Sequence, residues 1–581
     1  MKRYNVNFIN QNMTLAVNEG ANLAKICDKA GFSLDLVCGG KGTCGKCMVE
    51  IEIKNEKSSV LACMTEINSD LNIYLDEKNY GRNARILESS ADHAYSFNPS
   101  LKKIYKDKKS IKAEFKDEFL RGCSLDVMRD FAKLINKTEC KGITFILYEG
   151  EIIDVQLGDT TKFIYGAAVD VGTTTVVLYV YDLNTGSLIN SYSDLNGQIS
   201  AGADVISRIS YADSQKSLKE LNGKIISVLN NLVESAEFEI QNLKENLYNI
   251  ILCGNSTMQH LFFGLRPDSL GISPFKSITK DYVNCCGRDT GLKCPDRCKV
   301  VFLPLLGGFV GADTTAVLLT IDDDMKDRLI IDLGTNGEIA AGNINNYYVA
   351  STACGPALEG GSMDCGMRGA EGAIEKIKIE NDDVVLEVIG GREPSGICGS
   401  GIIDVTAEML KNNIIDSSGR MLTKDEYELI KPHSKLGGRI KEIKGINSFI
   451  LYERKDRIVY ISQKDIRQIQ LAKSSIYSGC MALLNACGKS IDSVDEIIVA
   501  GAFGNYIDVE NAIFIGLLPD AFPKIKAVGN GAGNGTAMFL LDRNMKEKCD
   551  KITENSTHYE LADDECFASG YIFNMNFTDL K

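Results

Sequence analysis

The chain has 581 residues, enough for three or four domains, and it carries a formal net charge of −14. Nucleic acid and anionic membrane surfaces repel such a charge, so we expect neither as a partner. No apolar run approaches the roughly 20 residues that span a bilayer, and the first residues lead directly into a strand pattern. We therefore expect a cytoplasmic protein whose 19 cysteines are reduced thiols or metal ligands.

Residues 1–80 have the pattern of a small mixed sheet with one helix. Alternating or periodic apolar residues predict these elements in chain order: strands at 4–8 and 13–17, a helix at 23–30, and strands at 49–53 and 71–75. This order is typical of a ferredoxin domain with the β-grasp fold.

Four cysteines of this region have the spacing C-x5-C-x2-C-x15-C: Cys38, Cys44, Cys47 and Cys63. Three of them lie in a glycine-rich loop, where the backbone can close around a small inorganic core. Thiolates are the usual ligands of iron–sulfur clusters, so we predict that these four residues are the metal ligands of a 2Fe-2S cluster. A structural zinc site is the alternative, but zinc sites usually combine two C-x2-C hooks and this region has one.

Residues 81–97 lack apolar periodicity and are predicted to form a linker, and residues 98–163 a small middle domain. The lysine-rich stretch at 102–116 is interpreted as a solvent-exposed helix face, with a docking patch as the alternative. Further along, the pattern predicts a helix at 125–136 and a hairpin of strands at 143–148 and 152–157.

Residues 164–581 contain one strand-and-turn motif twice. The first copy is Asp170, Val171, Gly172, Thr173, Thr174 and Thr175, and the second is Asp332, Leu333, Gly334, Thr335, Asn336 and Gly337. In both copies the acid ends a buried strand, where it can orient Mg²⁺ or a water, and the turn offers backbone N–H groups to phosphate. The repeat predicts a duplicated nucleotide-binding domain with Asp170 and Asp332 as its catalytic acids.

These motifs resemble those of the ATPase superfamily of actin, sugar kinases and heat-shock chaperones. The resemblance implies that a glycine-rich turn after a later strand, at 496–500, receives the adenosine: Gly501, Ala502, Phe503 and Gly504. A glycine-rich loop at 529–535, leading into an apolar helix, is expected to complete the pocket. Residues 251–257 and 307–313 resemble the segments that connect the two lobes in this superfamily.

A further glycine-rich block, residues 351–369, is unlike the substrate loop of a sugar kinase. Together with the cysteine quartet and the duplicated phosphate motifs, it makes nearly the whole chain similar to the reductive activators of corrinoid proteins. The resemblance implies an α+β and α/β multidomain fold: a β-grasp 2Fe-2S ferredoxin domain, a small middle domain and a duplicated, actin-like (ribonuclease-H-like) ATPase domain.

The same resemblance implies an ATP-hydrolysing electron-transfer activase that uses a 2Fe-2S cluster, ATP and Mg²⁺. Its partner is expected to be a corrinoid protein of a methyltransferase system, which it returns from inactive cobalt(II) to cobalt(I). An external low-potential electron donor supplies the electron, and the ATPase domain is expected to form a homodimer. Three other functions stay open: an ATP-driven donor to a non-corrinoid enzyme, a small-molecule kinase with a redox-sensing ferredoxin domain, and a chaperone-like module with a structural cluster.

The remaining cysteines and the histidines give weaker signals. Cys285, Cys286, Cys294 and Cys298 fall within fourteen residues, and zinc or a second cluster is one interpretation. Adjacent cysteines rarely both reach one metal, which argues against it. Three further cysteines lack an evident fourth partner and are interpreted as packing thiols or loop residues: Cys354, Cys365 and Cys398. The four histidines show no paired spacing, so we assign them no role.

Overall fold

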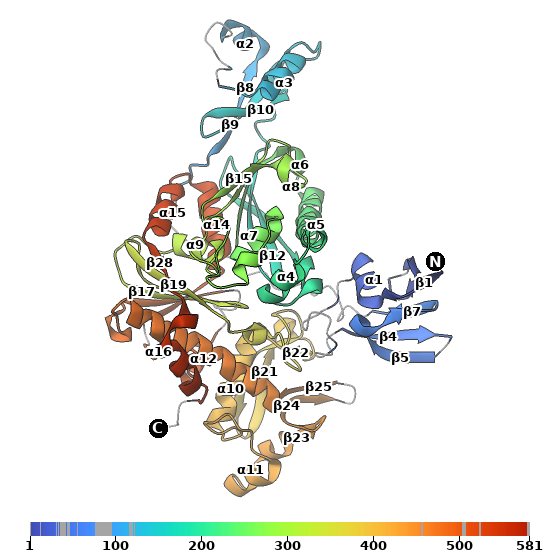
Figure 1. Cartoon of the computed structure of the whole chain (residues 1–581), viewed down its shortest axis with the longest axis vertical. Coiled ribbons are helices and arrows are strands. Elements are labelled where there is room, and N and C mark those ends of the chain that lie inside the picture. The colour runs from blue at the N-terminus through green and yellow to red at the C-terminus, as the bar shows by residue number, and fades with distance from the viewer. Residues whose placement is uncertain are drawn as a thin grey trace.

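The structure is a computed structural model, and it describes residues 2–11, 13–30, 32, 34, 42, 47–54, 56–75, 96–114, 120, 122–454, 457–501, 507–521 and 524–577. In this part of the chain, a five-stranded and a three-stranded sheet precede two six-stranded sheets that form the centres of two lobes (Figure 1). No helix among the described residues combines the length and apolarity needed to cross a bilayer.

The five-stranded sheet has the strand order β2-β1-β7-β4-β5. Its elements are β1 (Arg3–Phe8), β2 (Met13–Asn18), β3 (Ala21–Asn22), α1 (Leu23–Lys29), β4 (Met48–Ile53), β5 (Glu56–Leu61), β6 (Glu66–Ile67) and β7 (Leu71–Tyr74). Strand β1 pairs parallel with β7, and the other neighbours in the sheet pair antiparallel. The predicted mixed sheet of a β-grasp ferredoxin domain is confirmed. Strand β5 was not predicted, because its mostly exposed residues give no apolar alternation.

The three-stranded sheet has the order β10-β9-β8 and lies at one end of the molecule (Figure 1). Its elements are β8 (Leu101–Asp107), α2 (Lys108–Glu114), α3 (Leu125–Ile135), β9 (Gly142–Tyr148) and β10 (Glu151–Leu157). The predicted helix and hairpin are confirmed. The prediction of one exposed lysine-rich helix is wrong for its first half, which is strand β8. Lys103 of that strand donates hydrogen bonds to Gln156 at 2.7 Å and to Asn246 of the first lobe at 2.6 Å.

The two six-stranded sheets have the same arrangement in five of their strands. The first has the order β13-β12-β11-β14-β16-β15, and the second has the order β28-β19-β18-β17-β26-β27. The strands β13-β12-β11-β14-β16 of the first correspond to β19-β18-β17-β26-β27 of the second. In each, three antiparallel strands are followed by two parallel ones. The predicted duplicated actin-like fold is therefore confirmed.

The strands of the first sheet are β11 (Tyr165–Val171), β12 (Thr175–Asp182), β13 (Leu188–Leu195), β14 (Leu247–Gly254), β15 (Val283–Cys286) and β16 (Lys299–Phe302). The strands of the second are β17 (Arg328–Leu333), β18 (Gly337–Asn343), β19 (Asn346–Thr352), β26 (Glu496–Ala500), β27 (Ile525–Gly529) and β28 (Ser556–His558). Both copies of the predicted motif lie at the turn of a hairpin, the first between β11 and β12 and the second between β17 and β18.

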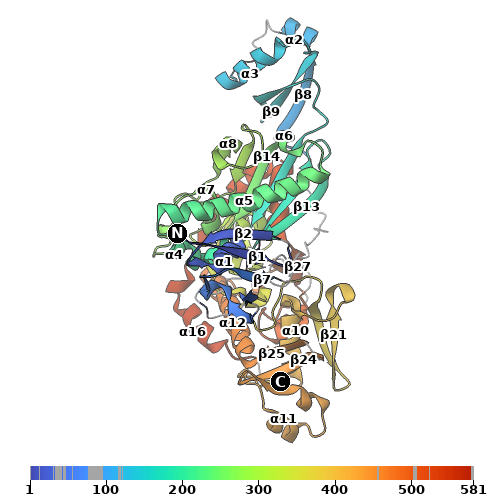
Figure 2. The same cartoon turned by 90° about the vertical axis from the view of Figure 1, so that its right-hand side faces the viewer.

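Helices cover both faces of each sheet. The principal helices of the two lobes are α4 (Val205–Tyr211), α5 (Gln215–Glu239), α7 (Ser256–Phe263), α9 (Ala312–Leu319), α12 (Gln463–Ala486), α14 (Gly531–Leu541), α15 (Met545–Glu554) and α16 (Glu565–Phe573). Figure 2 shows α5 lying across the first lobe, and α14 packs on β11 and β14 of the same sheet. Along β17, Leu329 and Ile331 belong to the core beneath α12, whereas Ile330 belongs to the core shared with the first lobe. Both faces of the second sheet are therefore buried.

The second lobe is extended by a long insertion between β19 and α12. It contains β20 (Ala373–Glu380), β21 (Asp383–Val388), β22 (Gly396–Ile397), α10 (Gly399–Lys411), α11 (Lys424–Ile430), β23 (Ile440–Ile443), β24 (Ile446–Arg454) and β25 (Arg457–Ser462). The short helix α13 (Val509–Phe514) packs against α10. The glycine-rich block at 351–369 joins β19 to this insertion.

The glycine-rich loop predicted at 529–535 is mostly helix, because α14 begins at Gly531. A Cβ atom at Gly535 would lie 1.7 Å from the carbonyl oxygen of Ala316 in α9. Glycine is needed there for two helices to approach closely. The expectation that this segment helps to complete the pocket is confirmed, because Asn530 and Ala532 line the cavity between the lobes. The strand predicted at 496–500 is confirmed as β26.

Candidate functional site

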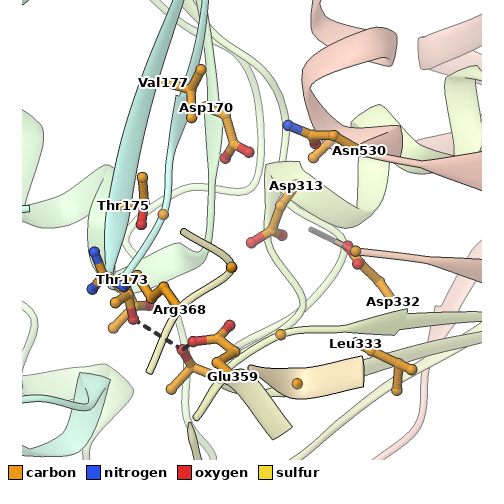
Figure 3. Close-up of a pocket in the computed structure, with 18 of the residues that line it drawn as sticks. Asp170, Thr173, Thr175, Val177, Asp313, Asp332, Leu333, Glu359, Arg368 and Asn530 are labelled. Carbon is orange, nitrogen blue, oxygen red and sulfur yellow. Dashed lines mark hydrogen bonds between the residues drawn. The ribbon is translucent and has the colours of Figure 1, made fainter. Parts of the chain in front are cut away.

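A cavity of about 270 Å³ lies between the two lobes, where the turns of both hairpins meet (Figure 3). Most of the residues predicted to act on nucleotide line it: Asp170, Gly172, Thr173, Thr174, Thr175, Asp332, Gly334, Thr335, Asn336 and Gly501. Gly337 is not among the lining residues; it begins β18 and packs against Thr352 and Ile476. Ala502, Phe503 and Gly504 lie outside the described residues.

The first turn is anchored from behind by side chains of its own lobe. Asn196 donates its side-chain N–H to the carbonyl oxygen of Gly172 at 2.9 Å, and its backbone N–H to that of Thr174 at 3.0 Å. Arg208, which is fully buried, donates to the carbonyl oxygen of Thr173. Asn255, at the start of α7, donates to the hydroxyl of Thr173 at 2.8 Å. The carbonyl oxygens of the turn are thus occupied within the lobe.

The second turn has different anchors. The Sγ atom of Cys354 lies 3.4 Å from the carbonyl oxygen of Gly334 and 3.5 Å from that of Thr335. The hydroxyl of Thr335 donates to Oε2 of Glu359 at 3.0 Å. Cys354 was interpreted from the sequence as a packing thiol, and it is indeed buried, but it also contacts this turn.

The two turns also contact each other. The Oγ1 atoms of Thr174 and Thr335 are 3.2 Å apart, within hydrogen-bond distance. Together with the bond from Thr335 to Glu359, this contact makes a chain from the first lobe through the second turn to the glycine-rich block, drawn dashed in Figure 3. The lobes are therefore linked by side chains at the point where both predicted phosphate loops end.

Several buried carboxyl groups surround the cavity. Burial, and next the charge of Asp313, raise the pKa of Asp170 to about 7. The same two causes raise the pKa of Asp332 to about 7, and burial raises that of Asp313 to about 6. Burial also raises the pKa of Glu338 well above its ordinary value. Ionised carboxylates gathered in this way repel one another, so the cavity favours cations.

Three acids that line the cavity were not predicted as site residues: Asp313, Glu338 and Glu359. Asp313 is the second residue of α9 and lies within the predicted connecting segment, and Glu338 pairs with Asp332 across the β17–β18 hairpin. Glu359 comes from the glycine-rich block, as does Arg368, which also lines the cavity. Glu338 directly follows the predicted motif, and this adjacency is the signal that could have identified it.

Two of the four predicted cluster ligands are described. Cys47 and Cys63 are both buried, and their Sγ atoms are 3.2 Å apart. Burial raises the pKa of Cys47 to about 11. The geometry fits two ligands that converge on one metal centre. Cys38 and Cys44 lie outside the described residues.

Across the residues that the structure describes, no group of three or more His, Cys, Asp or Glu side chains is arranged to hold a metal ion. The described residues include Cys285, Cys286, Cys294 and Cys298, which lie around β15 and α8 (Gly287–Thr290). Mg²⁺ bound with a nucleotide needs only one or two carboxylates, because phosphate oxygens and water complete its shell. The predicted Mg²⁺ therefore stays a prediction.

Three protein-family models match this chain. The family model of a 2Fe-2S iron-sulfur cluster binding domain matches residues 7–68. The model of the RACo middle region matches residues 165–326, and that of the C-terminal domain of RACo, the ASKHA domain, matches residues 326–581. The corrinoid activation enzyme RamQ of Eubacterium limosum is 40% identical, with 97% of each chain aligned. The chain belongs to this family of corrinoid activation enzymes.

Two further relatives agree with the family. The [Co(II) methylated amine-specific corrinoid protein] reductase of Methanosarcina barkeri is 23% identical over 71% of this chain and 77% of that one. The solved structure of a reductive activator for corrinoid, iron-sulfur protein matches with a TM-score of 0.75 and 26% identity, over 99% of this chain and 98% of the other. The family's middle region corresponds to the first lobe, and not to the segment 98–163 that we named the small middle domain. Our domain boundaries remain predictions.

Proposed function

We propose that this chain is an ATP-hydrolysing electron-transfer activase that reduces the cobalt(II) form of a corrinoid protein of a methyltransferase system to cobalt(I). The observation that carries the proposal is the coexistence, in one chain of this family, of a 2Fe-2S domain match and a cavity lined by two phosphate-type turns. An electron carrier alone needs no such cavity, and a kinase alone needs no such carrier.

The residues have separate tasks in this proposal. Cys38, Cys44, Cys47 and Cys63 hold the 2Fe-2S cluster, which supplies one-electron transfer when bound. Asp170 and Asp332 orient Mg²⁺ and water at the terminal phosphate of ATP, while the backbone of both turns and Gly501 bind the nucleotide. One electron passes from an external low-potential donor to cobalt, so the donor is oxidised as cobalt(II) becomes cobalt(I). We further propose a cytoplasmic homodimer that associates through the ATPase domain.

The need for ATP follows from redox potentials. Plant-type 2Fe-2S centres have potentials near about −400 mV, which is too high to reduce a very low-potential acceptor readily. Nucleotide binding shifts a conformational equilibrium only if the two conformations bind it unequally. The contact between Thr174 and Thr335 supports such a role, because it joins the two lobes at the cavity that nucleotide would enter.

The decisive experiment mixes this protein, Mg²⁺, ATP and a low-potential chemical reductant with a corrinoid protein of a methyltransferase system. We expect the visible spectrum to change from cobalt(II) to cobalt(I), and omission of ATP to leave most of the cobalt(II). Cys44→Ser should abolish the conversion but retain ATP binding. Failure of the wild-type protein to bind or reduce that corrinoid protein would contradict the proposal, as would full activity of the Cys44→Ser variant.

The cluster itself is checked separately by metal analysis. Protein purified without oxygen should contain about two irons and about two acid-labile sulfides per chain. Cys63→Ser removes a thiolate from outside the main loop and should remove most of the visible absorption. Zinc in place of iron would rule out the redox function.

A further inference from the structure

The cavity between the lobes is unusually rich in acids and poor in basic groups. Its described lining residues include six with carboxyl side chains, Asp170, Asp313, Asp332, Glu338, Glu359 and Glu375, whereas Arg368 is the one Lys or Arg among them. A nucleotide adds further negative charge through its phosphates. Any phosphate that enters this cavity therefore needs cations, and Arg368 is a cation that the chain itself supplies.

Arg368 lies between groups of both lobes. It is half-buried and belongs to the glycine-rich block of the second lobe, and Figure 3 shows it in the same part of the cavity as Thr173 and Glu359. Burial raises the pKa of Glu359, while a hydrogen bond from Thr335 and the charge of Arg368 act against this shift. Arg368 is also within electrostatic range of Asp194 in β13 of the first lobe. Its charge thus acts on acids of both lobes.

The carboxylate of Glu359 accepts a hydrogen bond at the two turns, where a phosphate oxygen could accept it instead. It accepts the hydroxyl hydrogen of Thr335, whose Oγ1 atom also contacts Thr174, and it lies near Arg368. Carboxylate and phosphate oxygens are interchangeable acceptors for a threonine hydroxyl and an arginine guanidinium. A terminal phosphate that reaches these turns competes with Glu359 for the same donors.

We propose that Arg368 binds the terminal phosphate of the nucleotide in exchange for Glu359, and is thereby the residue with which this protein distinguishes a nucleoside triphosphate from a diphosphate. The inference rests on the proposed function, because it needs ATP in the cavity. Because Arg368 and Glu359 both belong to the glycine-rich block 351–369, this block would then bind the terminal phosphate. The planar fork of arginine suits this task, since it can bind two phosphate oxygens at once.

The test is selective binding, measured by isothermal titration calorimetry on the full-length protein. The ligands are MgADP and the Mg²⁺ complex of a non-hydrolysable ATP analogue that keeps a terminal phosphate. Arg368→Gln should weaken binding of the analogue about tenfold to a hundredfold, the value of a lost charge-assisted hydrogen bond, and change MgADP binding less than about twofold. Arg368→Lys keeps the positive charge but loses the planar fork. Its affinity for the analogue should therefore lie between those of the wild-type protein and Arg368→Gln.

Glu359→Gln tests whether Glu359 competes with the terminal phosphate, and its expected effect on affinity is opposite to that of Arg368→Gln. Neutralising the competitor should strengthen binding of the analogue about threefold to tenfold without strengthening that of MgADP. In the Arg368→Gln background this gain should disappear, because the two residues act on one phosphate. The matched control is Arg392→Gln, which removes an exposed arginine paired with Glu371 at 2.8 Å and should change neither affinity.

Two results would overturn the inference: equal losses for both nucleotides in Arg368→Gln, or no loss for the analogue. If Arg368→Gln loses the same affinity for both nucleotides and its circular dichroism spectrum changes, Arg368 has a structural role. Arg368→Lys should then also lose affinity equally for both nucleotides. Wild-type protein that binds neither nucleotide would contradict the proposed function itself, an outcome separate from a failure confined to the Arg368 variants.

Discussion

In the first lobe the turn after β11 is held by an amide and a guanidinium, whereas in the second lobe the turn after β17 is held by a thiol and a carboxylate. Asn196 and Arg208 donate to three carbonyl oxygens of the first turn. Cys354 is a weak donor to the second turn, and Glu359 is an acceptor there. Two hairpins with the same strand order therefore differ in how firmly their turns are fixed.

This difference separates two tasks that the motif alone assigns equally to both lobes. The first turn has its carbonyl oxygens occupied by strong donors from within its own lobe, so we expect it to be the more rigid of the two turns. The principal polar partner of the second turn is a carboxylate, and an anionic ligand can replace it. The conformational response to nucleotide is therefore expected in the second lobe, around Thr335 and Glu359.

The largest expected effect concerns the acids at the ends of the paired strands. Asp332→Asn should retain the fold and ATP binding but lower hydrolysis by roughly two orders of magnitude, the scale of losing one positioned polar group. Phosphate release measures hydrolysis, and calorimetry measures binding. Asp170→Asn is the matched change in the first lobe. A wild-type rate in Asp332→Asn would mean that the second hairpin does not supply a catalytic acid.

The sequence was sufficient for the features that depend on local pattern. A buried strand, an acid and a glycine turn recur at Asp170 and Asp332, so both hairpins could be predicted and both line the cavity. At Gly172, a Cβ atom would lie 2.4 Å from the carbonyl oxygen of Thr175, which explains the glycine of the first copy. The β-grasp sheet followed in the same way from alternating apolar residues.

The groups that anchor and complete the site could not be predicted, because they depend on packing between distant segments. Arg208 reaches Thr173 from a helix 35 residues away, and no local pattern marks it. Lys103 appeared to belong to an exposed helix, yet its strand pairs with β9 and its ammonium group donates to the first lobe. Contacts between segments override local propensity in such cases.

The second prediction tests the rigidity of the first turn. Arg208→Met keeps much of the buried volume but leaves the carbonyl oxygens of Thr173 and Gly202 without this donor, so local opening should become easier by roughly 2–3 kcal/mol. Hydrogen exchange detected by mass spectrometry should then be roughly 30 to 150 times faster at residues 172–175. The control Arg266→Gln removes an exposed arginine paired with Asp268 and should leave this exchange unchanged. Unchanged exchange in Arg208→Met would show that the first turn is no more firmly held than the second.

The smallest expected effect concerns the contact between the two turns. Thr174→Val and Thr335→Val each remove one hydroxyl of the pair at 3.2 Å while keeping the side-chain shape, and the double variant removes both. Because Thr335→Val also removes the bond to Glu359, the single variants are compared through a double-mutant cycle, which cancels effects that belong to one residue alone. We expect a coupling of about 0.5–1 kcal/mol in the opening free energy of residues 172–175, measured by hydrogen exchange without nucleotide.

Thr174→Ser and Thr335→Ser retain the hydroxyls and should retain the coupling. If the coupling is zero, the two turns are neighbours that do not hold each other, and closure of the lobes must then depend on the ligand alone.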